Sequence, residues 1–359
     1  MIQFLADNID QLDLALDQLA VGDRNFDRFA MMLIDNVIEL TLHKYVKDEA
    51  SSNSQSLHMY TRMAEMRQQL SDSEDESEES KHLLELIAKQ KIIERGLGQA
   101  FDNKIKAAAK LGLVDSSTCE TILYLHSYRN SAYHKGLRHE SILHSLALFY
   151  FRTVCALLMA YKPRSWSYSS STKLSHRAMK YLGEISMFSI LFDDRENIFR
   201  SAYTRLDCIA ASMTQDLVGD LSADISETID STDKSIDFLS NEGPHKRSRD
   251  DVVIYAQAWP FAFTKEADDF AMANGCKEEF RKPFVDWIAR NYSWPVKSDP
   301  IPAWRKRHRA LINEKDHHKA LKRYCEFIHQ TEDIRGKIDE AAMGLEMHIQ
   351  HQIDVMRGK

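Results

Sequence analysis

The chain has 359 residues, of which 43% are hydrophobic and 28% are charged, and its net charge is −7. This composition is typical of a globular protein, and the length allows two domains with a core in each. A negative chain is not drawn to nucleic acid as a whole, so any RNA-binding surface has to be a local patch.

Targeting signals and metal-binding cysteine motifs are not found in the sequence. No segment has the roughly 18 uninterrupted apolar residues of a membrane helix, and the N-terminus lacks the basic region of a secretory signal. The five cysteines are scattered, odd in number and without a Cys-x-x-Cys pair. They indicate reduced thiols rather than a disulfide framework or a zinc site. We therefore expect a cytoplasmic protein with no membrane partner.

The first 162 residues favour helices, because they contain no proline. Apolar residues at helical spacing predict a helix hairpin over residues 2–19 and 25–47. A polar linker is expected at 51–56, and the acidic serine-rich run at 71–80 (SDSEDESEES) is expected to be a mobile loop.

Four further helices are predicted in this half, over residues 82–95, 99–111, 119–133 and 141–161. The last of these is the most apolar, as expected for the central helix of a bundle. Gly96-Leu97-Gly98 lacks the context of a nucleotide-binding loop and indicates a turn.

A serine-rich linker at 163–175 (PRSWSYSSSTKLS) is the predicted domain boundary. Residues 176–359 are expected to form a second, mainly helical domain. Five of the seven prolines and four of the five tryptophans fall between residues 252 and 304, which predicts an irregular stretch. The fold class is therefore all-α, with an N-terminal helical bundle followed by a second mainly helical domain.

One constellation has the residue types that RNA cleavage requires. In the run HSYRNSAYHKG (126–136), Asn130 and His134 are four residues apart and share a helix face with His126. Arg129 flanks that face, and its long guanidinium can reach it. Arginine suits phosphate because it is always charged and can bind in a bidentate manner. Histidine suits proton transfer because its unperturbed pKa is roughly 6.5.

An arginine, a polar residue and a histidine a few residues later, near the end of a helix, resemble the signature of the HEPN family. The resemblance covers about residues 1–162, including the hairpin and the run FDNKIKAAAKLGLVDSSTCETILYLHSYRN (101–130). It implies a metal-independent endoribonuclease without a cofactor, acting as a homodimer. It further implies a toxin or antiphage effector, held in check by an antitoxin or another regulatory protein. Some HEPN toxins carry a tyrosine two positions after the histidine; here that position is Gly136, so inactivation by adenylylation is not expected.

The reaction assigns a role to each residue of the motif. His134 is the predicted general base or acid, Arg129 the phosphate clamp and Asn130 an orienting amide. The expected products are a 2′,3′-cyclic phosphate and a 5′-hydroxyl. Further residues are weaker candidates for RNA contact, either beside the motif or in the basic run after Trp304. They are His126, Tyr133, Lys135, Trp304, Arg305, Lys306, Arg307 and Arg309.

Alternative interpretations stay open. The pattern also occurs at Arg138/His144 and Arg323/His329, and any such pair can be an ordinary surface or capping pair. The histidines at 317–318, 348 and 351 lack the further ligands that a zinc site needs, so no metal site is expected. A protein of another class, a non-catalytic helical scaffold that binds RNA or protein, fits the same sequence with a degenerate HEPN half.

Overall fold

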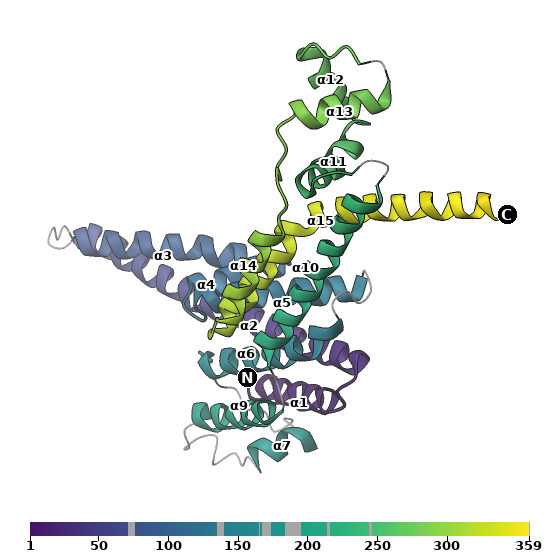
Figure 1. The fold of residues 1–359 in the computed structure, drawn as a ribbon. Coiled ribbons are helices and arrows are strands. Elements are labelled where there is room, and N and C mark those ends of the chain that lie inside the picture. The colour runs from purple at the N-terminus through teal and green to yellow at the C-terminus, as the bar shows by residue number, and fades with distance from the viewer. Residues whose placement is uncertain are drawn as a thin grey trace. The chain divides into compact units, whose positions relative to one another are not determined.

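The computed structural model describes residues 1–70, 76–134, 140–164, 166, 174–183, 195–213, 216–243, 246–278 and 280–358. It divides into two compact units, unit 1 (Met1–Leu217) and unit 2 (Val218–Lys359). The described residues form helices without any strand, so the predicted all-α class is confirmed (Figure 1).

Unit 1 opens with a helix hairpin. Helix α1 (Ile2–Leu19) has the predicted bounds, and Gly22, with φ of +66°, provides the turn before α2 (Arg24–Leu70). The linker predicted at 51–56 is wrong, because α2 continues through it. Asn53 is buried there, and its Nδ2 donates to the Leu86 carbonyl oxygen at 3.2 Å and to Gln90 Oε1 at 2.9 Å. Tertiary packing therefore overrides the weak helix propensity of these polar residues.

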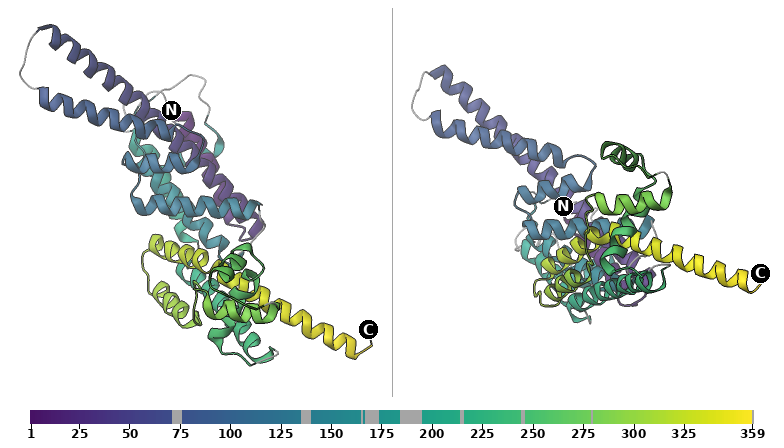
Figure 2. Two further views of the ribbon diagram at one scale, coloured as in Figure 1. Left: turned by 90° about the horizontal axis from the view of Figure 1, so that it is seen from above. Right: turned by 45° about the horizontal axis from the view of Figure 1, so that its top comes forward.

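Helix α3 (Glu76–Gly96) pairs with the second half of α2, and the two form a long arm (Figures 1 and 2). The acidic loop predicted at 71–80 is wrong for residues 76–80, which belong to α3, and residues 71–75 lie outside the described part of the chain. The arm joins the bundle at a tight contact, because a Cβ added to Gly96 would lie 2.6 Å from the Ala107 Cβ of α4.

The rest of the bundle is α4 (Phe101–Lys110), α5 (Ser116–His134), the 3-10 turn η1 (Glu140–Ile142) and α6 (Leu143–Ala160). Helix α6 is long and apolar enough in composition to cross a membrane, but 72% of it is buried inside the structure. This burial is what a core helix of a soluble protein shows, and it agrees with the prediction that this helix is central.

The structure extends unit 1 to Leu217, beyond the linker expected at 163–175. Helices α7 (His176–Leu182) and α9 (Arg195–Ser212) pack on α1, and α9 also packs on α6. The buried Tyr181 donates its hydroxyl to Asp13 on α1, at 2.6 Å. A serine-rich segment has the same composition whether it joins two domains or crosses the surface of one, so composition alone misplaces the boundary.

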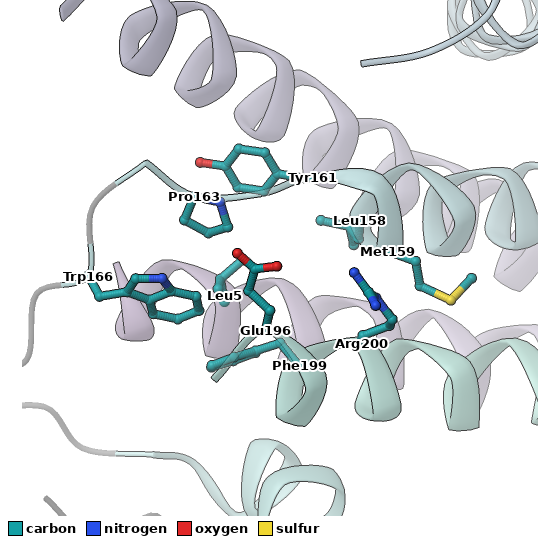
Figure 3. A pocket seen from close by; sticks show the side chains of 9 residues that line it. All are labelled: Leu5, Leu158, Met159, Tyr161, Pro163, Trp166, Glu196, Phe199 and Arg200. Atoms are coloured by element: carbon teal, nitrogen blue, oxygen red, sulfur yellow. The ribbon is translucent and has the colours of Figure 1, made fainter. Parts of the chain in front are cut away.

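The segment after α6 lies against this core. Figure 3 shows Pro163 and Trp166 beside Phe199 of α9, with the rings of Trp166 and Phe199 5.9 Å apart. The cavity between them is about 20 Å³, which is room for one water molecule and not for a substrate.

Unit 2 is made of six helices among its described residues. They are α10 (Leu217–Glu242), α11 (Arg249–Phe261), α12 (Lys265–Ala273), α13 (Arg281–Asn291), α14 (Ile301–Ile312) and α15 (His317–Met356).

The stretch predicted as irregular, 252–304, is wrong in its main feature, because most of it is helical. Its prolines lie near helix ends: Pro283 and Pro302 are in the first turns of α13 and α14, where a missing N–H costs nothing. Pro260 lies one residue before the end of α11. Trp294 is buried in a core that joins α11, α12 and α13, as expected for packed tryptophans.

Candidate functional site

The centre of the candidate site is a buried carboxylate that the sequence analysis did not single out. Asp35 of α2 is completely buried, and three side chains from two other helices donate to it. The Nδ1 atom of His126 lies 2.9 Å from Asp35 Oδ1, and the hydroxyl of Tyr150 lies 2.6 Å from the same oxygen. The guanidinium of Arg129 forms an ion pair with Oδ2. Asp35 thus connects α2 with α5 and α6.

A second set of contacts links the α5 residues to one another. Arg129 Nη1 donates to Asn130 Oδ1 at 2.8 Å, and Asn130 Nδ2 lies 3.1 Å from His126 Nε2. Arg129 and Asn130 therefore come together as the sequence predicts, with His126 added one turn earlier.

The hydrogen bonds assign the tautomer of His126. Because Arg129 donates to the oxygen of the Asn130 amide, the amide NH₂ faces His126 Nε2, which must accept. The ring proton then sits on Nδ1 and is donated to Asp35. Both ring nitrogens of His126 are thus hydrogen-bonded within the cluster, and the ring orients Asp35 and Asn130.

An aromatic side chain covers one face of the His126 ring. Phe101 of α4 stacks on His126 with centroids 3.7 Å apart and planes within 5°. The His126 side chain keeps only 16% of its surface exposed, which corrects its place among the expected RNA contacts. The Arg129 side chain is more open, with 28% of its surface exposed, although its Nε atom is buried without a hydrogen-bond partner among the described residues.

The electrostatics of the cluster favour an ionised Asp35. Burial by itself raises the pKa of this carboxyl, but the hydrogen bonds from His126 and Tyr150 and the charge of Arg129 outweigh it and hold the pKa below its ordinary value. Burial also raises the pKa of Tyr150 well above its ordinary range, and the charge of Asp35 adds to this effect. Tyr150 is therefore a hydroxyl donor at every physiological pH.

Other motif residues lie outside what the structure describes. His134 is the last residue of α5, but its side chain and that of Tyr133 are outside the described part, and so is Lys135. The competing pairs are partly explained: His144 Nδ1 lies 2.8 Å from Asp27, and Arg323 pairs with Glu314 at 3.1 Å.

The basic run of α14 is not the open stacking surface that the sequence suggested. Trp304 is buried against Phe327 with ring centroids 5.7 Å apart, so its ring has no free face for a base. Arg305 pairs with Asp233 at 2.6 Å, and Arg307 lies over Phe327. Lys306 and Arg309 stay exposed. The packing of the apolar face of α14 explains these contacts, because it places Arg305 toward α10 and Arg307 toward α15.

Asp35 carries one signal in the sequence. It lies one turn from Met31 and Ile38, both buried and apolar, on the face of α2 that packs into the bundle. A carboxylate at such a position needs a buried partner, but spacing does not say which of many distant cations supplies it. In the part of the chain that the structure describes, no three His, Cys, Asp or Glu side chains group as metal ligands.

Comparison with known protein families, with curated proteins and with solved structures gives no match to this chain.

Proposed function

We propose that the chain is a metal-independent endoribonuclease in which Arg129 binds the scissile phosphate and His134 moves protons. The observation that supports this most is the orientation of Arg129. Asp35 and Asn130 each accept from one arm of the guanidinium, while the side chain keeps 28% of its surface exposed. An arginine fixed in this way binds an anion without first losing its own conformational freedom.

The reaction needs one group that binds the phosphate and two groups that transfer protons. The 2′-oxygen attacks phosphorus as its proton passes to a base, and the bond from phosphorus to the 5′-oxygen breaks as an acid protonates that oxygen. Arg129 offsets the charge of the phosphorane. His134 follows Asn130 by one helical turn in α5 and takes one of the two proton-transfer roles.

The second proton-transfer group follows from the resemblance to HEPN proteins. Both nitrogens of His126 are engaged, so this ring does not supply it. In a homodimer, His134 of a second copy does. The resemblance also places the protein among toxins or antiphage effectors that an antitoxin or regulatory protein restrains.

The test is cleavage of labelled RNA in EDTA by the purified full chain. We expect His134→Ala and Arg129→Lys each to abolish cleavage and 2′,3′-cyclic phosphate formation. The lysine variant keeps a cation beside Asp35 but loses the planar fork. His329→Ala and Arg290→Lys are matched controls in unit 2, where Arg290 is exposed, and should cleave normally. Full cleavage by both motif variants would reject the assigned site.

A second candidate is a helical scaffold without catalysis. The observation that favours it is that Asp35 neutralises Arg129 and ties α2, α5 and α6 together, which is a sufficient structural reason for both residues. A folded protein that cleaves no RNA as a monomer or dimer, under any added trigger, favours this function.

A further inference from the structure

The last turns of α15 extend past the other helices of unit 2 (Figures 1 and 2). Buried residues occur along α15 as far as Ile338, and none of the residues from Asp339 to Met356 is buried. Ser235 of α10 donates to Asp339 at 3.2 Å. Beyond this contact, in the part of α15 that the structure describes, side-chain hydrogen bonds run within the helix itself. About five turns of helix, roughly 27 Å long, are therefore left with partly or fully exposed side chains.

The buried apolar face of α15 continues along these exposed turns. Ile334 and Ile338 keep only 5% and 0% of their surface exposed. At about 100° per residue, most of the apolar residues that follow fall on the same side of the helix as Ile338. This apolar stripe consists of Ala341, Ala342, Leu345, Ile349, Ile353 and Met356. An apolar stripe on a polar helix indicates that another element packs on it.

The charges around the apolar stripe select the kind of partner. Four carboxylates lie outside the stripe, and no lysine or arginine occurs between residues 339 and 356. Nucleic acid and anionic membrane surfaces attract basic segments, so neither fits an acidic helix. A partner with an apolar stripe of its own fits it.

The apolar stripe has the heptad order of two identical parallel helices. Leu345 takes a d position and Ile349 the following a position, a combination that favours two parallel strands. Ile338 and Gln352 are the other d residues, and Ala342 and Met356 are the other a residues. A twofold axis along the pair brings each of these residues to the same residue of the second copy.

The flanking positions also fit a second copy in parallel register. The e positions hold Asp339 and Glu346, whereas the g positions hold Ala341, His348 and Val355. In a parallel pair each e residue faces a g residue of the partner, so no carboxylate meets another. An antiparallel pair with its apolar residues in register places e beside e and brings the two copies of Glu346 together, which like charges disfavour.

The geometry points to a homodimer interface on α15, at which residues 338–356 of two copies of this chain pair in parallel. The helix is continuous with the part of α15 that unit 2 holds, so pairing does not require the helix to form first. The inference does not rest on RNA cleavage, because the oligomeric state is measured without RNA. It also supplies the second copy that the proposed cleavage requires.

The experiment is sedimentation analysis of the full chain over a range of micromolar concentrations. We expect a monomer–dimer equilibrium whose dimer fraction rises with concentration. Leu345→Asp and Ile349→Asp should each raise the dissociation constant by about a hundredfold or more, because a symmetric interface would bury the new charge twice. Met347→Asp is the matched control on the opposite side of the same helix, where Met347 is 60% exposed, and it should dimerise like the unmodified chain.

These variants should all fold, because the substituted residues lie beyond the last buried residue of α15, and circular dichroism checks this. A chain that stays monomeric up to high micromolar concentration overturns the proposal. So does a dimer that Leu345→Asp and Ile349→Asp leave unchanged, or one that Met347→Asp weakens equally.

Crosslinking tests the direction of pairing. In a parallel pair the Met356 positions of the two copies meet, so Met356→Cys should form a disulfide-linked dimer when diamide oxidises the thiols. Gln350→Cys places a thiol on the outer side of the helix, where residue 350 is exposed, and should crosslink much less. The unmodified chain gives the background from its own cysteines. Equal crosslinking of the two variants would contradict the parallel arrangement.

Discussion

Replacing Asp35 with asparagine tests the central cluster without changing its size. The variant removes the charge that balances Arg129 and turns one acceptor oxygen into an NH₂ group facing donors from His126, Tyr150 or Arg129. Breaking a buried pair in this way costs about 3–5 kcal/mol. Because Arg129 is partly exposed and water can solvate it, we expect the lower part of that range, about 3 kcal/mol.

The variant should also change the acid sensitivity of unit 1. The pKa of Asp35 in the folded protein lies below its ordinary value of 3.8, so the ionised form stabilises the fold. This stabilisation is complete above the unfolded pKa and is lost as the pH falls toward the folded pKa. Asp35→Asn removes the contribution at neutral pH and flattens the loss of stability below about pH 4.

The assay is urea denaturation combined with hydrogen exchange of peptides from α2 and α5, which reports on unit 1 separately from unit 2. The Asp7→Asn variant is the control, because Asp7 is exposed and bonds only Gln3 on its own helix among the described residues. Asp35→Asn should raise the exchange rates of both helices and lower the urea midpoint. Exchange and a midpoint equal to those of the control would refute the claim that Asp35 holds α2 to α5.

Three further changes have defined outcomes. Tyr150→Phe removes one donor to Asp35 and should lower the free energy of unfolding by about 1–2 kcal/mol in urea denaturation. The pKa of Asp35 should rise in a proton titration, and an unchanged urea midpoint would contradict this. Gly96→Ala places a methyl group 2.6 Å from a side chain of α4 and should destabilise unit 1 by about 1–3 kcal/mol, read as a lower Tm. In thiol labelling of the native protein, the exposed Cys208 should react fast, while Cys155 should react only on unfolding because burial raises the pKa of its thiol; equal rates would contradict the described packing.

The local sequence pattern was sufficient to predict a helix that has an amphipathic face and a clear end. Helix α1 begins and ends where its apolar period and the glycine after it predict. The pattern was insufficient where contacts with residues far along the chain determine whether a segment is helical. Asn53 belongs to a helix because Leu86 and Gln90 hold it, and nothing within the run of serines and asparagine around it indicates this.

The candidate site could likewise be predicted only in part from the local sequence. Helical spacing brings Arg129, Asn130 and His126 to one region of α5, and the structure joins them by hydrogen bonds. Asp35, the acceptor that Arg129 and His126 share, lies 94 residues before Arg129, and Tyr150 lies on a third helix. Such pairings depend on how the helices pack, so spacing within α5 could not predict that the guanidinium is held by a buried carboxylate.

Cleavage of end-labelled RNA by Arg129→Lys protein, measured in EDTA beside the unmodified chain, tests the proposed activity most directly. We expect the unmodified chain to release fragments ending in a 2′,3′-cyclic phosphate and the folded lysine variant to release none. Equal fragment yields from the two proteins, with the same ends, would contradict the role assigned to the Arg129 fork.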